Sequence, residues 1–373
     1  MRSSAETPTP SRGWPSHRGV VTGYLWKLIR ESASMTQTAL AEDLGVDVAS
    51  IQAWESGRRP LTALRAGDLA RYRIHLLRQG ASPALFGVLP DAIEADLVID
   101  HALATDRHDS AADRHPLAAT VHRRDLTNLI TWPITGITPT HLRPLLSQPA
   151  RRGPVARHPV LLARDQAALL QHLVHIADAH QETAETLLRR QAVYLLSFDA
   201  NRQTVDWLAA EHTRAMRHAV RPPDLASWMT IRSSAIGLSR YGQPDALSDF
   251  VRLGLADHQH EVANLAYWAY WVGEITEIHT DDRFMTTGAP TWNGATLLAH
   301  LINRVTPGAD QIELNVHTLA HLLLARPNLL AQRPDLRQRT LTTVSDTLDS
   351  GGLRPGIRQE LSNIAYAARL AAR

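Results

Sequence analysis

The chain of 373 residues contains no cysteine, and this absence removes several kinds of chemistry. Without thiols it cannot form disulfides, supply thiolate metal ligands or use a cysteine nucleophile. It also lacks an uninterrupted apolar run of about 18 residues, so we expect no membrane-spanning helix. Residues 1–20 have no apolar signal core, and we predict a flexible arm there. Together these features predict a cytoplasmic protein.

Lysine is almost absent, because Lys27 stands alone against 38 arginines. This bias suggests a GC-rich genome as much as any special use of arginine. The net charge is only +2, yet it is unevenly distributed. Residues 1–80 hold 11 basic and 7 acidic side chains, residues 107–160 hold 8 and 3, and the remainder is acidic. A basic N-terminal half favours contact of that end with phosphates.

Helical periodicity is present along most of the chain, and it predicts an all-α fold. Residues 21–80 show the apolar spacing of several short helices, and residues 83–105 predict an acidic helix broken at Pro90. Residues 161–373 predict eight to ten helices with short connections, either a solenoid or an irregular bundle. One stretch faintly resembles a tetratricopeptide (TPR) helix pair, but no period of about 34 residues recurs.

Residues 107–160 differ in composition, since they hold seven of the 21 prolines. A plain linker and a partly ordered connector that packs on a domain both remain open, and the apolar stretch LTNLITWPITG favours the second. We therefore predict four parts: an arm at 1–20, a DNA-binding domain with a helical extension at 21–106, a Pro/Arg-rich connector at 107–160, and an α-helical sensor and oligomerisation domain at 161–373.

The stretch MTQTALAEDLGVDVASIQAWESG, residues 35–57, predicts two short helices around a turn. Ala41 is small where the two helices must cross closely. Gly45 suits the turn, because a positive φ is favourable for glycine. Asp47 is placed to cap the second helix. Apolar side chains recur at the spacing that closes a small core: Leu40, Leu44, Val46, Ile51 and Trp54.

On these residues, positions 22–78 resemble the helix-turn-helix of the XRE family, the phage-repressor-like regulators with a five-helix-type DNA-binding domain. The resemblance implies that Gln37 contacts a phosphate and that Arg30 and Glu55 tie the first helix to the end of the recognition helix. A helix-turn-helix kept only as a structural module remains the alternative. The positions assigned to the frame of the motif are Arg30, Ala41, Gly45, Ile51, Trp54 and Glu55.

In this family the first turns of the second motif helix reach base edges in the major groove. Gln52 can bond adenine with two hydrogen bonds, whereas Val48 and Ala49 can contact only a thymine methyl group. The base-reading candidates are Asp47, Val48, Ala49, Gln52 and Ala53. The phosphate-contacting candidates are Gln37, Thr38, Ser50, Arg58 and Arg59.

These side chains offer few hydrogen bonds for reading bases directly. One bidentate contact supplies about 1–3 kcal/mol of discrimination, whereas specific regulators need about 4–10 kcal/mol over non-specific binding. The difference must come from a second copy of the domain, from DNA shape, or from an arm in the minor groove that carries Arg12 and Arg18. We therefore predict a homodimer on double-stranded DNA.

The C-terminal region offers one candidate ligand pocket. Residues 264–275, NLAYWAYWVGEI, are nearly all apolar, so they form either buried core or the wall of a pocket. The loop at 276–294 is long for a helix connection, and it is either a lid over a peptide or small molecule or a plain loop. The candidate pocket residues are Tyr267, Trp268, Trp271, Glu274 and Trp292.

Histidines recur at spacings that zinc sites use: Glu313, His317 and His321 lie four apart, and His172 and His175 three apart. With 19 histidines, chance pairs are expected, so we predict no metal and no cofactor. The sequence has no HExxH motif, no phosphate-binding glycine-rich loop and no G-x-S-x-G elbow. We therefore expect no enzyme.

The combined features predict a bacterial, dimeric transcriptional regulator whose C-terminal domain oligomerises and senses a small-molecule or peptide effector. Two alternatives stay open. One is a DNA-maintenance or defence protein that uses the helix-turn-helix to find replication or foreign DNA, with the C-terminal region as a scaffold for protein partners. The other is a scaffold that acts without nucleic acid.

Overall fold

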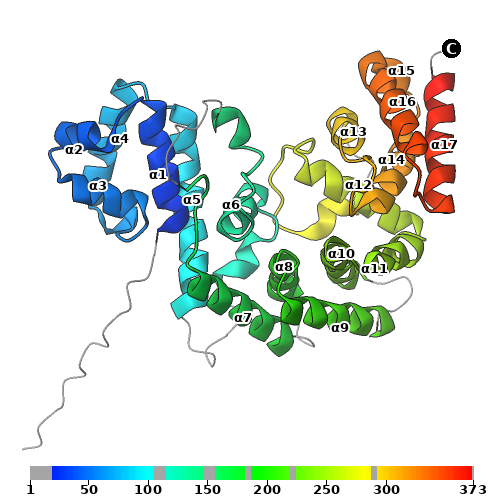
Figure 1. Cartoon of the computed structure of the whole chain (residues 1–373), viewed down its shortest axis with the longest axis horizontal. Coiled ribbons are helices and arrows are strands. Elements are labelled where there is room, and N and C mark those ends of the chain that lie inside the picture. Colours follow the sequence, from blue (N-terminus) through cyan, green and yellow to red (C-terminus); the bar gives the residue numbers. More distant parts are fainter. Residues whose placement is uncertain are drawn as a thin grey trace, which may run out of the picture. The chain divides into compact units, whose positions relative to one another are not determined.

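The computed structural model describes residues 19–104, 115–146, 156–180, 186–218, 224–286 and 292–371 (Figure 1). These described residues form helices and no strand, which confirms the all-α prediction. The chain divides into two compact units, one from residues 1–116 and 125–172, the other from residues 117–124 and 173–373. Among the described helices none is long and apolar enough to span a membrane. The four-part division predicted from the sequence stays a prediction.

The first unit begins with five α-helices, drawn in blue to cyan in Figure 1. They are α1 (Val20–Ser32), α2 (Gln37–Leu44), α3 (Val48–Glu55), α4 (Ala66–Arg78) and α5 (Pro83–Ala104), with the 3-10 turn η1 (Leu61–Ala63) before α4. The hydroxyl of Thr36 caps α2 by accepting a hydrogen bond from the Ala39 N–H at 3.1 Å. Gly45 ends that helix with a φ of 66°. Local sequence signals therefore set both ends of α2.

An indole forms the centre of this unit. Trp26 on α1 is fully buried, and its ring meets the edges of Trp54 on α3 and Phe86 on α5 at centroid distances of 6.5 and 6.4 Å. Three helices thus share one aromatic contact. The prediction that Pro90 breaks the helix was wrong, because α5 runs through it. Apolar packing on both sides of Pro90 outweighs the single backbone hydrogen bond that a proline removes.

A carboxylate from α5 caps the start of α1. The N-cap residue of α1, Gly19, has no side chain to accept a hydrogen bond. Asp96 supplies it instead, because its two carboxylate oxygens accept hydrogen bonds from the backbone N–H groups of Val21 (2.9 Å) and Thr22 (2.8 Å). Burial outweighs these bonds and raises the pKa of Asp96 to about 7. The helical extension α5 is therefore bound to the motif through a polar contact as well as through apolar packing.

The described part of the segment 107–160 contributes helical structure to the same unit. It contains α6 (Arg124–Thr135) and the turn η4 (Arg143–Leu146), and α7 (Ala163–Ala179) follows. Trp132 on α6 is fully buried and packs edge-on against Tyr24 of α1 at 5.1 Å. The apolar residues of the stretch LTNLITWPITG, which set it apart from a plain linker, thus form the buried face of α6.

The second unit is a set of packed helices around an extensive apolar core. Its neighbours in sequence frequently pack as pairs, such as α9 with α10 and α16 with α17, and α14 packs on α17 (Figure 1). The core includes the fully buried rings of Trp228 and Phe250. Its elements are α8 (Thr186–Leu196), α9 (Arg202–His218), α10 (Leu225–Arg240), α11 (Pro244–Asp249), α12 (His258–Trp271), α13 (Ala295–Ile302), α14 (Ile312–Ala325), α15 (Leu329–Gln332), α16 (Pro334–Asp349) and α17 (Pro355–Leu370).

Candidate nucleic-acid interface

Helix α3 has one buried face and one open face. Ile51 and Trp54 lie three residues apart and are buried against the rest of the unit. The other face is open: Ala49 and Gln52 are exposed, as is Asp47 at the start of the helix. Val48, Ser50 and Ala53 are partly buried. Three of the five proposed base-reading side chains are thus exposed on α3 or at its start, and two are partly covered.

Asp47 holds the N-cap position of α3 without capping it through its side chain. The N–H groups of Ser50 and Ile51 bond the backbone carbonyl of Asp47 at 2.8 and 3.4 Å, and the carboxylate makes no cap hydrogen bond. The expected side-chain cap is therefore not formed. The carboxylate stays on the surface, where it repels phosphate and can accept a hydrogen bond from cytosine.

A buried ion pair fixes the position of α3 relative to α1 and α2. The guanidinium of Arg30 donates to both carboxylate oxygens of Glu55, at 2.5 and 3.0 Å, and to the carbonyl of Met35 at 2.6 Å. The two side chains are only 7% and 5% exposed. A bidentate arginine–carboxylate pair sets direction as well as distance. The pair therefore determines how the open face of α3 is presented.

Gln37 joins the same network. Its amide nitrogen donates to the second carboxylate oxygen of Glu55 at 2.7 Å. An amide NH₂ carries two hydrogens, so one remains for a phosphate oxygen. The role that the family resemblance gives Gln37 is thus compatible with its hydrogen bond to Glu55, and α2 is coupled to the end of α3 through it.

Glycine backbone allows α1 to lie against the end of α3. A Cβ atom added at Gly23 would be 2.3 Å from the carbonyl oxygen of Trp54, and one at Gly57 would be 2.7 Å from Gly19. Gly57 also has a φ of 73°, which favours glycine. Sequence reasoning did not single out Gly23. Its signal was a glycine inside an otherwise apolar helical run, which often marks a close backbone approach.

Cationic and hydroxyl groups flank the open face. Thr38 is exposed on α2, and Arg58 and Arg59 are exposed directly after α3. The guanidinium of Arg58 donates to the hydroxyl of Ser56 at 3.1 Å. Their contact with DNA phosphates stays a prediction, and their exposure is compatible with it. The arm residues Arg12 and Arg18 lie outside the described residues.

The aromatic candidates of the second unit are packed inside the protein. Tyr267 and Trp268 are buried, and the guanidinium of Arg232 lies over their rings at 4.4 and 5.1 Å. Trp271 is partly buried, with Tyr194 5.9 Å from its ring. These contacts match the core-packing interpretation of the stretch at 264–275.

The other two pocket candidates also make internal contacts. The carboxylate of Glu274 accepts hydrogen bonds from the N–H groups of Gly294 (2.7 Å) and Leu297 (2.8 Å), so it caps α13. Trp292 is buried under the guanidinium of Arg326 at 4.6 Å. Glu274 therefore acts here as a helix cap at the end of the long loop.

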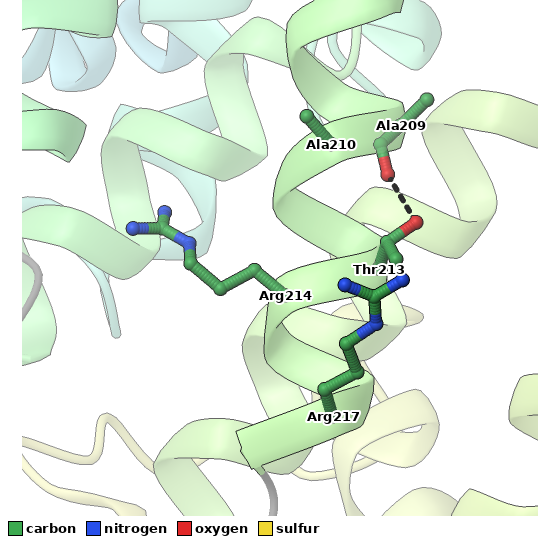
Figure 2. Close-up of a pocket in the computed structure, with 5 residues that line it drawn as sticks. All are labelled: Ala209, Ala210, Thr213, Arg214 and Arg217. Atoms are coloured by element: carbon green, nitrogen blue, oxygen red, sulfur yellow. Dashed lines mark hydrogen bonds between the residues drawn. The ribbon is translucent and has the colours of Figure 1, made fainter.

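A surface pocket lies elsewhere, along α9 (Figure 2). All of its lining residues belong to that one helix, and the hydroxyl of Thr213 bonds the carbonyl of Ala209 at 2.9 Å. A site on one helix face encloses little of a ligand. None of the five aromatic-pocket candidates lines it; the residues drawn are Ala209, Ala210, Thr213, Arg214 and Arg217.

Comparison with known proteins agrees with this geometry. A family model described as helix-turn-helix matches residues 27–72, a span that begins in α1, includes α2 and α3 and ends in α4. No curated protein and no solved structure matches the chain. The match falls on the segment whose buried ion pair and open helix face are described above. Residues 27–72 are a helix-turn-helix of the XRE family, a type of domain that binds DNA.

Proposed function

We propose that this chain is a sequence-specific regulator of transcription that reads operator DNA with the open face of α3. The observation that carries the proposal is the exposure of Gln52 on that face, inside a matched helix-turn-helix. Gln52 is the residue of α3 whose side-chain amide can form two hydrogen bonds with one adenine edge. Thr38, Arg58 and Arg59 then contact phosphates on either side.

The regulator acts as a homodimer in the cytoplasm. The support is energetic, because one glutamine and a few small side chains provide about 1–3 kcal/mol of direct discrimination. Two domains on an inverted repeat double the number of contacts, and the half-sites then lie about one helical turn apart. DNA shape supplies further preference.

The second unit serves as a non-enzymatic module for oligomerisation and effector sensing. Its size supports this role, because a helical unit with an extensive apolar core is large enough to carry both an interface and a regulatory site. An effector would act by binding one arrangement of the dimer more tightly than another.

Selection of genomic fragments tests the proposal. The full chain is mixed with sheared DNA from its own genome at about 150 mM salt, close to physiological ionic strength, and the retained fragments are sequenced. Enrichment of a few promoters that contain an inverted repeat is the expected result. Enrichment at a replication origin or chromosome end would instead support the maintenance role, and absence of any enrichment would overturn DNA recognition by α3.

A further inference from the structure

Three side chains from two helices of the second unit converge on one point. They are Glu261 on α12 and His317 and His321 on α14, and their ligand atoms all lie within 4.8 Å of one another. The Nε2 atom of His317 is 2.5 Å from one carboxylate oxygen of Glu261, and the Nδ1 atom of His321 is 3.5 Å from the other. Among the described residues this is the one group of at least three potential ligands so close together.

The grouping differs from the one that spacing suggested. Glu313 shares a helical face with the two histidines in sequence, but its carboxylate faces the Ser248 hydroxyl at 2.5 Å and the Arg354 guanidinium at 3.8 Å. Glu261 takes its place from a helix 56 residues earlier. Packing between α12 and α14 brings this carboxylate to the histidines, and periodicity within α14 cannot reveal it.

One carboxylate oxygen of Glu261 has no hydrogen-bond partner. The residue is 6% exposed, and its Oε2 oxygen is buried without a hydrogen-bond partner. A buried acceptor with no partner is destabilising and is rare in stable proteins. This oxygen lies 3.5 Å from Nδ1 of His321, at ion-pair distance but without a hydrogen bond, so it is turned toward the point where the two histidines meet.

A second carboxylate orients the central ring. The Oε1 atom of Glu360 on α17 is 3.5 Å from Nδ1 of His317, on the opposite side from Glu261. Glu261 and Glu360 thus hold the two nitrogens of the His317 ring from opposite sides. One ring nitrogen held by a carboxylate while the other faces a ligand position is the arrangement found around metal-binding histidines.

We propose that Glu261, His317 and His321 bind a divalent transition-metal ion of the zinc class, with Glu360 as the outer carboxylate that holds His317. Two imidazoles and one carboxylate suit Zn²⁺ and its neighbours, and water completes the coordination. Bonds of about 2.0–2.1 Å place ligand atoms about 3.3 Å apart. The carboxylate oxygen of Glu261 and the His321 nitrogen are already close to this spacing, at 3.5 Å. The oxygen of Glu261 and the His317 nitrogen, now 2.5 Å apart, would have to separate by less than about 1 Å, which side-chain rotation allows.

The ion would join three helices of the second unit. It would link α12 to α14 directly and α17 through Glu360. The site is independent of the proposed DNA-binding role, because all four side chains belong to the second unit.

Calorimetric titration with Zn²⁺ alone tests the proposal. The full chain without an affinity tag is stripped with a chelator, dialysed and titrated. We expect a site that binds one Zn²⁺ per chain and whose affinity falls at least tenfold in His321→Gln. His75→Gln is the matched control, because His75 is equally exposed (32%) and faces Asp43 at 3.2 Å in the first unit. The control should leave the affinity unchanged.

Absorption spectra of the Co²⁺-loaded wild-type protein give a second readout that needs no variant. Visible bands of a nitrogen- and oxygen-ligated ion are expected, and they should be lost in Glu261→Gln. If the wild-type chain binds no Zn²⁺, or if both variants bind it as the wild type does, the cluster is only a proton-held ion pair and the proposal fails.

Discussion

A buried arginine in each unit, Arg30 in the first and Arg232 in the second, is compensated in a different way. Arg30 and Arg232 are 6% and 4% exposed. Arg30 meets a carboxylate, Glu55, through two hydrogen bonds. Arg232 instead lies over the rings of Tyr267 and Trp268, and its Nε atom has no hydrogen-bond partner. The same residue type is thus compensated by an opposite charge at Arg30 and by aromatic faces at Arg232.

The difference follows from what each arginine must do. An ion pair with fixed geometry holds α3 at a defined angle, and that angle decides what the open face of the helix presents. Cation–π contacts are less directional, so they fill an aromatic core without setting a surface. Burial also lowers the pKa of Arg232, because desolvation disfavours its charge. We therefore expect the two arginines to respond differently to substitution.

The largest effect is expected at Glu55. Glu55→Ala leaves the buried charge of Arg30 with only the Met35 carbonyl and the more distant, exposed Glu31 carboxylate, and loss of one partner of a buried ion pair costs about 3–5 kcal/mol. Hydrogen exchange of the α1 and α3 amides in the full chain should show this loss. A double variant, Arg30→Met with Glu55→Leu, removes both charges and should recover most of the stability. A loss below about 1 kcal/mol in Glu55→Ala would show that the pair does not hold the motif.

Asp96 should make the stability of the first unit depend on pH. Its folded pKa, about 7, lies above its ordinary value of 3.8, so between these values the folded state binds more protons than the unfolded state. Stability is then lost as pH rises from about 4 to about 7, by at most about 1.4 kcal/mol per pH unit.

Asp96→Asn isolates this dependence. Hydrogen exchange of α1 amides at pH 5 and pH 8, corrected for the intrinsic exchange rate, should show a smaller pH effect in the variant than in the wild type. Equal pH effects in the two proteins would mean that the carboxylate is already ionised at pH 5, with its two backbone hydrogen bonds outweighing burial.

The smallest effect on stability is expected at Arg232. Arg232→Met removes a buried charge without leaving an unpaired carboxylate, and hydrophobic replacement of buried ions is often neutral. Urea unfolding of the full chain should change by less than about 1.5 kcal/mol, since methionine keeps much of the side-chain volume. A loss comparable with that of Glu55→Ala would show that aromatic compensation is as specific as the ion pair.

Sequence reasoning succeeded where the determining contacts are local. The turn at Gly45 and the apolar spacing of Ile51 and Trp54 both act within a few residues. The cap at Thr36 was not predicted, and the side-chain cap predicted at Asp47 does not form. Sequence reasoning failed at Pro90, where packing with distant helices sustains α5. It also gave no sign that Asp96 caps a helix 75 residues earlier, because no local pattern encodes that contact.

The same limit applies to the second unit. Its helices follow from periodicity, but the partner of each side chain depends on how the helices cross. The histidines of α14 were recognised as a set, whereas Glu261 reaches them only through packing of α12. Likewise the aromatic residues at 264–275 were singled out, but the arginine that lies over them comes from α10.

The most direct test of DNA recognition by α3 compares Gln52→Ala with Arg59→Ala in the full chain. Fluorescence anisotropy would measure binding to a selected genomic fragment and to a scrambled duplex over a range of salt concentrations. Gln52→Ala should lose about 1–3 kcal/mol on the selected fragment and nothing on the scrambled one. Arg59→Ala should weaken both equally and reduce the salt slope by about one. Unchanged binding of Gln52→Ala to the selected fragment would contradict the assignment of α3 as the helix that reads bases.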